Sequence, residues 1–161
     1  MPNIVPNLWV DTQAEEAAQF YVSVFPNSRI VDVTHYTEAG PREAGMVLTV
    51  ELELDGQRFT AINGGPQFTF DEAISFLIEC GDQAEIDRYW DALREGGGEE
   101  GPCGWLKDRY GLSWQVVPKG MGDYFAGDPD PARAQRAMQA MLGMRKLDVA
   151  ALKAAADGAP A

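Results

Sequence analysis

The chain has 161 residues, of which 45% are hydrophobic and 24% are charged, and its formal net charge is −12. This length suits one domain with a substantial core, and the acidity argues against nucleic acid or an anionic membrane as a partner. No apolar run approaches the roughly 18 residues of a transmembrane helix, and the start at Met1-Pro2-Asn3-Ile4 lacks the features of a signal peptide. Two cysteines make no disulfide framework, so we expect a cytoplasmic protein with reduced thiols.

The first part of the chain has the pattern of a strand, a helix and three more strands. Thr12-Gln13-Ala14-Glu15 is a capping box that opens the helix, and Asp55-Gly56 is a strong hairpin signal between the last two strands. In chain order we expect a strand at 4–10, a helix ending before Phe25-Pro26, strands at 29–36 and 46–54, and a return strand at 57–62.

The same order then begins again. An apolar strand at 73–80 is followed by a second capping box, Asp82-Gln83-Ala84-Glu85, and by a helix that stops at Gly96-Gly97-Gly98. A hairpin closes this part, with one strand ending at Trp105-Leu106 and the other running from Leu112 to Val117. On the second of these strands Leu112, Trp114 and Val116 share one face, and Ser113, Gln115 and Val117 share the other.

Residues 121–161 have the pattern of a helical tail. A short helix is expected at 121–125, Asp130-Pro131 provides a cap with proline at the first helical position, and Asp148 can cap a last helix. A Met-rich stripe on the middle helix is typical of a docking face, with a binding surface as the alternative. We expect the tail to pack on the preceding domain or on a second subunit.

Two independent alignments indicate an internal duplication. Laying Thr12 on Asp82 superimposes Gln13-Ala14-Glu15 on the second copy of that tripeptide and places Val5 on Ser75. Laying Gly56 on Gly111 places Thr60 on Gln115. The predicted fold is therefore α+β: a domain over 1–120 built from two βαβββ units (about 3–66 and 67–120), whose mixed sheets pack one face on helices, plus a helical extension over 121–161.

Three motifs add a family resemblance. Asn63-Gly64-Gly65-Pro66, Cys103-Gly104-Trp105-Leu106-Lys107-Asp108 and Gly111-Leu112-Ser113-Trp114-Gln115 resemble the vicinal oxygen chelate superfamily, which includes glyoxalases, bleomycin-resistance proteins and dioxygenases. More narrowly, the chain resembles the PhnB-like branch, often labelled 3-demethylubiquinone 3-methyltransferase-like. The resemblance implies a curved sheet around a cleft, and a homodimer.

The resemblance also implies where a metal ion would be held. Metal-using members place four ligands on the first and last strands of the two units, and strand phase carries these positions to Val5, Thr60, Ser75 and Gln115. Valine cannot ligate, neutral hydroxyls are poor donors, and the glutamine offers one amide oxygen. We therefore expect no bound metal.

The remaining chemical candidates are few. The glycine clusters at 63–65 and 96–98 lack the strand, GxGxxG and helix context of a nucleotide site, so we expect no cofactor. His35 is the only histidine and is expected as an exposed residue at a strand end. Cys103 is expected in a tight turn, with a redox or nucleophilic role as the alternative. Glu51 and Glu53 share one strand face, either solvated or forming an acidic cleft wall.

These observations predict a metal-free protein with a small-molecule cleft, acting as a binder or as an enzyme without a bound ion. The expected ligand-binding residues are Asn7, Trp9, Arg58, Thr60, Ser75 and Gln115. Thr60 and Gln115 would donate or accept directional hydrogen bonds, Arg58 would pair with an anionic group, and Trp9 would stack. The alternatives are a metal-dependent glyoxalase or dioxygenase, an antibiotic-sequestering binder that attracts cationic compounds, and the methyltransferase of the family label.

Overall fold

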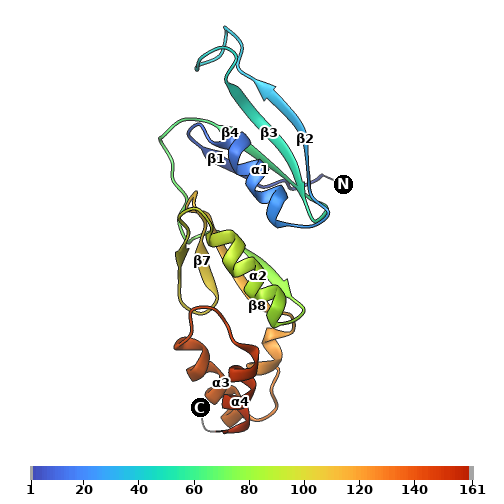
Figure 1. Ribbon diagram of the computed structural model, residues 1–161, viewed down its shortest axis with the longest axis vertical. Helices are drawn as coiled ribbons and strands as arrows, with labels where there is room; N and C mark the ends of the chain where they lie inside the picture. Colours follow the sequence, from blue (N-terminus) through green and yellow to red (C-terminus); the bar gives the residue numbers. More distant parts are fainter. Residues whose placement is uncertain (1, 160–161) are drawn as a thin grey trace. The chain divides into compact units, whose positions relative to one another are not determined.

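The computed structural model describes residues 2–159. Met1 and residues 160–161, the last two of the expected helical extension, lie outside the described residues. The chain divides into two compact units, one ending at Thr69 and the other beginning at Phe70. None of the helices within the described part is long and apolar enough to span a membrane. The architecture is the expected α+β fold with two four-stranded mixed sheets and C-terminal helices (Figure 1).

The first unit is one βαβββ module. Its sheet has the strand order β1-β4-β3-β2, in which β1 and β4 are parallel and the other neighbours are antiparallel. The helix lies along one face of this sheet (Figure 1), with Ala14, Ala17, Ala18 and Tyr21 buried. Its elements are β1 (Asn7–Val10), α1 (Ala14–Val24), β2 (Arg29–His35), β3 (Val47–Leu54) and β4 (Gln57–Asn63).

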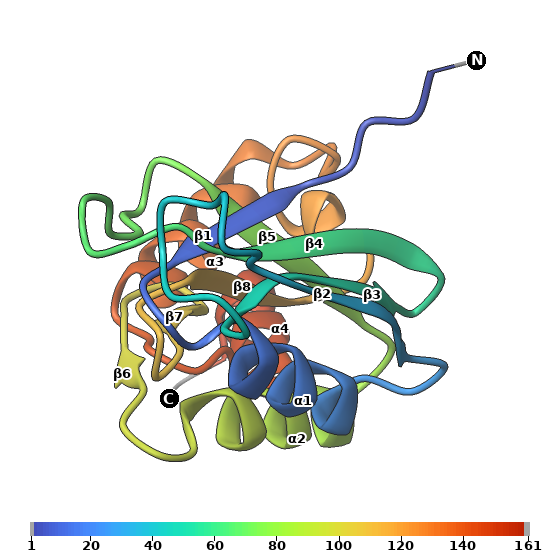
Figure 2. The same cartoon turned by 90° about the horizontal axis from the view of Figure 1, so that it is seen from above.

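Two sequence predictions for this unit need correction. The first strand begins at Asn7 rather than Ile4, because Pro6 has no N–H to donate and only its carbonyl joins the ladder, accepting from the Thr60 amide at 2.9 Å. The residues before it form an extended arm (Figure 2), so Val5 lies outside the strand. Thr12 does not cap α1: the N-cap position is Gln13, without a side-chain bond.

The second unit repeats the module. Its sheet has the order β5-β8-β7-β6, with β5 and β8 parallel and the other pairs antiparallel. The Asp82 side chain caps α2 by accepting from the Glu85 amide at 2.9 Å, as expected, while the Glu85 carboxylate accepts from the Gly81 amide at 2.7 Å. The module's elements are β5 (Ser75–Cys80), α2 (Gln83–Arg94), β6 (Glu99–Glu100), β7 (Trp105–Lys107) and β8 (Ser113–Pro118).

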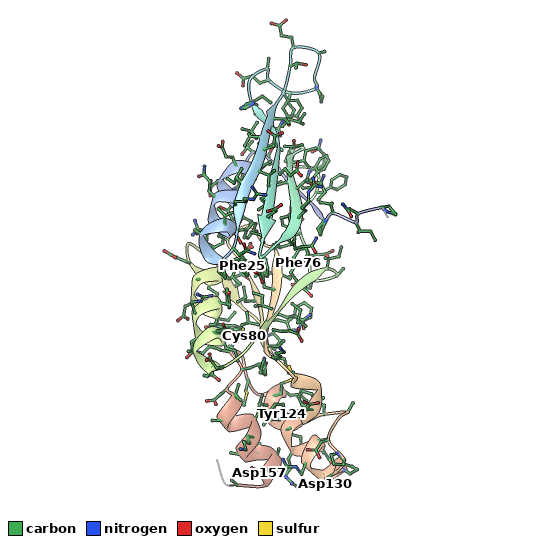
Figure 3. All side chains as sticks on the ribbon, turned by 90° about the vertical axis from the view of Figure 1, so that its right-hand side faces the viewer. Phe25, Phe76, Cys80, Tyr124, Asp130 and Asp157 are labelled. Atoms are coloured by element: carbon green, nitrogen blue, oxygen red, sulfur yellow. The ribbon has the colours of Figure 1, made fainter. Side chains whose placement is uncertain are left out.

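The helical tail is part of the second unit. It comprises η1 (Met121–Tyr124), α3 (Pro131–Leu142) and α4 (Val149–Asp157). The backbone amides of Cys103 and Gly104 donate to carbonyls of residues 144 and 145 at 2.8 and 2.7 Å. Arg133 near the start of α3 pairs with Asp157 at the end of α4, and Figure 3 shows Asp130 and Asp157 together at the tip of the tail. The tail therefore buttresses the turn that leads into β7.

Candidate functional site

In each unit the helix covers one face of the sheet and leaves the opposite face, here called the open face, to the predicted site residues. On β8, Trp114 and Val116 are buried on the helix side, whereas Gln115 has the opposite phase. On β5, Ser75 and Leu77 share the open face, and Leu77 is 54% exposed. Alternation thus brings the expected chelating positions of the second unit onto one surface.

The register confirms that the two modules correspond strand by strand. Asn7 pairs with Thr60 in the first unit, and Leu77 pairs with Gln115 in the second. Leu77 follows Asn7 by the same offset as Asp82 follows Thr12, and Gln115 follows Thr60 by the same offset as Gly111 follows Gly56. The two alignments made on sequence alone therefore agree with one set of backbone pairings.

Ser75 and Gln115 contact each other directly. The Gln115 Nε2 donates to the Ser75 Oγ at 2.9 Å, and both side chains are partly buried. The register sets Gln115 opposite Leu77 on one side and Trp105 on the other. The hydroxyl of Ser75 therefore accepts a hydrogen bond from an amide at the place where a metal site would have a ligand.

A hollow of about 390 Å³ opens beside this pair. We call it the Gln115 hollow. It is mostly apolar, and η1 and α3 of the tail complete its wall. Residues that line it include Leu77, Glu79, Trp105, Gln115, Val117, Met121 and Met141. Met141 belongs to the Met-rich stripe that was expected as a docking face or a binding surface, whereas nothing in the sequence assigned Trp105 or Met121 to a cleft. The register of β7 against β8 and the docking of the tail bring these residues to the hollow.

The open face of the first unit carries Asn7, Trp9, Arg58 and Thr60. Asn7 is exposed and lies beside the half-buried Thr60, as their pairing requires. Arg58 shares the face of Thr60, and its guanidinium forms an ion pair with Glu51 on the neighbouring strand. Glu53 is likewise paired with Arg29 at 2.8 Å, and that hydrogen bond is the main cause that lowers the pKa of Glu53. Arg58 thus meets a carboxylate of this chain in the place expected for an anionic ligand.

Trp9 is engaged by the glycine motif that follows β4. Its indole Nε1 donates to the Gly65 carbonyl at 2.9 Å, and its ring meets Phe68 edge-on at 5.0 Å between centroids. A Cβ at Gly64 would lie 2.3 Å from the Trp9 ring, so the turn holds an aromatic side chain where a nucleotide loop would hold a phosphate. The other glycine cluster is also packed: a Cβ at Gly98 would clash with the backbone of Arg94. Neither cluster fits the loop of a dinucleotide or methyl-donor site.

Asn63 is a structural residue that the sequence reading missed. It is 2% exposed, its Oδ1 accepts from the Ala14 amide at 2.8 Å, and its Nδ2 donates to the Val47 carbonyl at 2.9 Å. It therefore supplies the cap that Thr12 was expected to give, from a strand 49 residues further along the chain. Its own carbonyl accepts from the Tyr36 hydroxyl at 2.8 Å.

The side chains at the four chelating positions do not make a metal site. Val5 has no donor, Thr60 and Ser75 offer neutral hydroxyls, and Gln115 offers a single neutral amide oxygen, while its Nε2 donates to Ser75. Within residues 2–159, no group of three His, Cys, Asp or Glu side chains is placed to hold an ion. His35 is exposed at the end of β2 and lines a separate hollow beside Trp9. The donor set therefore does not fit the metal that the superfamily resemblance implies.

The two cysteines differ in environment. Cys80 is fully buried, and burial is the main cause that raises the pKa of its thiol to about 11. Cys103 has a left-handed backbone with φ 58° in the expected tight turn, and its thiol lies 3.6 Å from the Met141 carbonyl. It is only partly buried and borders the Gln115 hollow.

Comparisons with known proteins agree with this architecture. The sequence profile of the family described as 3-demethylubiquinone-9 3-methyltransferase matches residues 2–117. The PhnB protein from Bacillus cereus is 34% identical, with a TM-score of 0.63 over 72% of this chain and 99% of that one.

More distant structures share the fold. Protein PA1353 from Pseudomonas aeruginosa is 20% identical (TM-score 0.59, covering 74% of this chain and 99% of that one). FosX, a fosfomycin resistance protein from Listeria monocytogenes solved with Mn(II) and sulfate, is 14% identical (TM-score 0.51, covering 76% and 93%). No curated protein sequence matches the chain significantly.

Proposed function

The chain belongs to the family described as 3-demethylubiquinone-9 3-methyltransferase, the PhnB-like branch of the vicinal oxygen chelate superfamily, and on this premise we propose that it binds a small molecule at its open sheet faces without holding a metal ion. The hydrogen bond between Gln115 and Ser75 carries the proposal. It holds the Gln115 and Ser75 side chains against each other, while a hollow of ligand size opens beside them.

The lining of the Gln115 hollow defines the ligand chemistry. Leu77, Val117 and the two methionines favour an apolar body, and the indole of Trp105 favours a planar one. Gln115 and Glu79 supply the few polar contacts that orient such a ligand. A partly apolar, planar molecule with a hydrogen-bonding group, such as a quinone, fits this set.

The open face of the first unit offers a second set of candidate ligand contacts. Asn7 and Thr60 offer an amide and a hydroxyl on neighbouring strands, and Trp9 presents part of its ring on the same face. Arg58 would bind an anionic ligand group by exchanging its partner Glu51, which makes that contribution small because an exposed ion pair is replaced by another.

Methyl transfer and metal-dependent lyase or dioxygenase chemistry are the alternatives. The first has no loop for a methyl donor, since Gly64 packs on the Trp9 ring and Gly98 on the backbone of Arg94. The second needs carboxylate or imidazole ligands that the four positions lack. We also propose that the protein works as a homodimer, which light scattering of the purified protein tests directly.

A ligand-binding experiment tests the proposal. Thermal-shift screening against quinones, 2-oxo acids and cationic glycopeptides should identify quinones as the stabilising class, because a ligand that binds only the folded state raises the melting temperature by mass action. Titration calorimetry on Gln115→Leu should then show about tenfold weaker binding, which corresponds to the loss of one hydrogen bond. Gln19→Leu, at an exposed position on α1, is the matched control. Stabilisation only by the glycopeptides would favour sequestration, and equal binding by both variants would refute the assigned site.

A further inference from the structure

A second hollow, of about 460 Å³, lies in the same unit around β6, β7 and the start of β8. We call it the Ser113 hollow. It shares Cys103 and Trp105 with the Gln115 hollow, and the rest of its lining is different and more highly charged. The lining residues that matter here are Glu72, Glu99, Glu100, Trp105, Lys107 and Ser113.

Ser113 is the observation that points to a ligand. Its side chain is 1% exposed, and its Oγ has no hydrogen-bond partner within residues 2–159. On β8 it alternates with Trp114, which packs on the helix side, so the hydroxyl belongs to the open face and lines the hollow. Buried hydroxyls are almost always paired, and this one is left for a group that enters the hollow.

The charges around the hollow favour a cation. Lys107 pairs with Glu72 at 2.5 Å, and Glu100 pairs with Arg94 at 2.9 Å. Glu99 is exposed and has no ion-pair partner in the described part of the chain, and it lies opposite Lys107, whose own ion pair is with Glu72. The surrounding field is negative: the pKa of Lys107 is raised first by its hydrogen bond to Glu72, then by the charge of Glu72, and further by Glu99 and Asp71.

We propose that the Ser113 hollow binds a small organic cation, an amidinium, guanidinium or ammonium group on a planar body. The cation lies against the Glu99 carboxylate, one of its N–H groups donates to the Ser113 Oγ, and the planar body packs on Trp105. A metal ion is a poor occupant, because the carboxylates do not converge as a ligand set within residues 2–159. The proposal does not rest on the function assigned to the Gln115 hollow, since neither Ser113 nor Glu99 lines that hollow.

Three probes of one shape test the charge preference. Benzamidine, benzamide and benzoate share a ring and differ in charge, and two-dimensional amide NMR of the full chain locates where each one binds. Benzamidine should shift the amide signals of residues 99–101, 103–107 and 113 to saturation, and added salt should weaken its binding. Benzamide and benzoate should bind at least tenfold more weakly. Equal shifts by all three probes, or no saturable shift, would overturn the proposal.

Two variants then test the named contacts. Glu99→Gln and Ser113→Ala should each weaken benzamidine about fivefold or more, whereas Glu38→Gln, an exposed charge change in the first unit, should leave its affinity unchanged. Ser113→Ala should also melt no lower than the parent protein, because it removes an unpaired buried hydroxyl. A clearly lowered melting temperature would show that the hydroxyl already has a partner in the folded protein and would refute its role.

Discussion

Replacing Asn63 by alanine should destabilise the first unit strongly, although the residue is the last one of β4 and borders a glycine-rich turn where changes are normally tolerated. The side chain bonds the Ala14 amide at 2.8 Å and the Val47 carbonyl at 2.9 Å. Ala14 is completely buried, so water cannot replace the lost acceptor. An orphaned buried N–H costs about 1–3 kcal/mol, and the second lost bond costs about 1 kcal/mol. The expected loss is therefore about 2–4 kcal/mol in the free energy of unfolding.

Amide hydrogen exchange measures this loss where it arises. Protection of the α1 amides should fall by about 30- to 1,000-fold in Asn63→Ala, which is the factor that corresponds to the expected energy. Asn7→Ala, at an exposed asparagine of the same unit, should change protection by less than about threefold. If Asn63→Ala behaves like Asn7→Ala, the long-range cap is not formed and the account of this turn is wrong.

Three further predictions follow from particular contacts. Asp82→Ala should lower the free energy of unfolding in urea by about 1 kcal/mol, because it removes a formed helix cap. Thr12→Ala, at the equivalent position whose side chain does not cap α1, should change it by less than about 0.5 kcal/mol; equal losses would contradict this difference between the two helices. Iodoacetamide at about pH 8 should alkylate Cys103 well before Cys80. Burial raises the pKa of the Cys80 thiol to about 11, so this thiol stays protonated until the pH approaches that value; equal alkylation rates would contradict the burial of Cys80. Gly104→Ala should lower the melting temperature, because its φ is +84° and a Cβ would lie 2.9 Å from the carbonyl oxygen of residue 116; an unchanged melting temperature would refute the close packing of this turn.

Most of the architecture could be predicted because its signals are local and occur twice. Alternation along β8 separated Trp114 from Gln115 correctly, and the Asp82 cap was visible as a short-range motif. The Thr12 motif looked equally good, yet α1 takes its cap from Asn63. A short-range pattern cannot show that a residue from another strand competes for the same amide.

The candidate site was predictable only in part. Strand phase placed Ser75 and Gln115 on one face, but their mutual hydrogen bond depends on how far the two side chains reach. Strand phase also put Ser113 on the face of Gln115, but its importance comes from being buried and unpaired, and both properties belong to the folded chain. The same holds for Met121 and Met141, which line the Gln115 hollow because the tail folds back onto the sheet.

The central claim is that Ser75 and Gln115 hydrogen-bond to each other and do not coordinate a metal ion. Metal analysis of the protein purified without chelator is its most direct test. After incubation with Mn(II) or Zn(II) and dialysis, the account predicts far less than one ion per chain. One tightly held ion per chain, lost in Gln115→Leu but kept in Gln19→Leu, would contradict it.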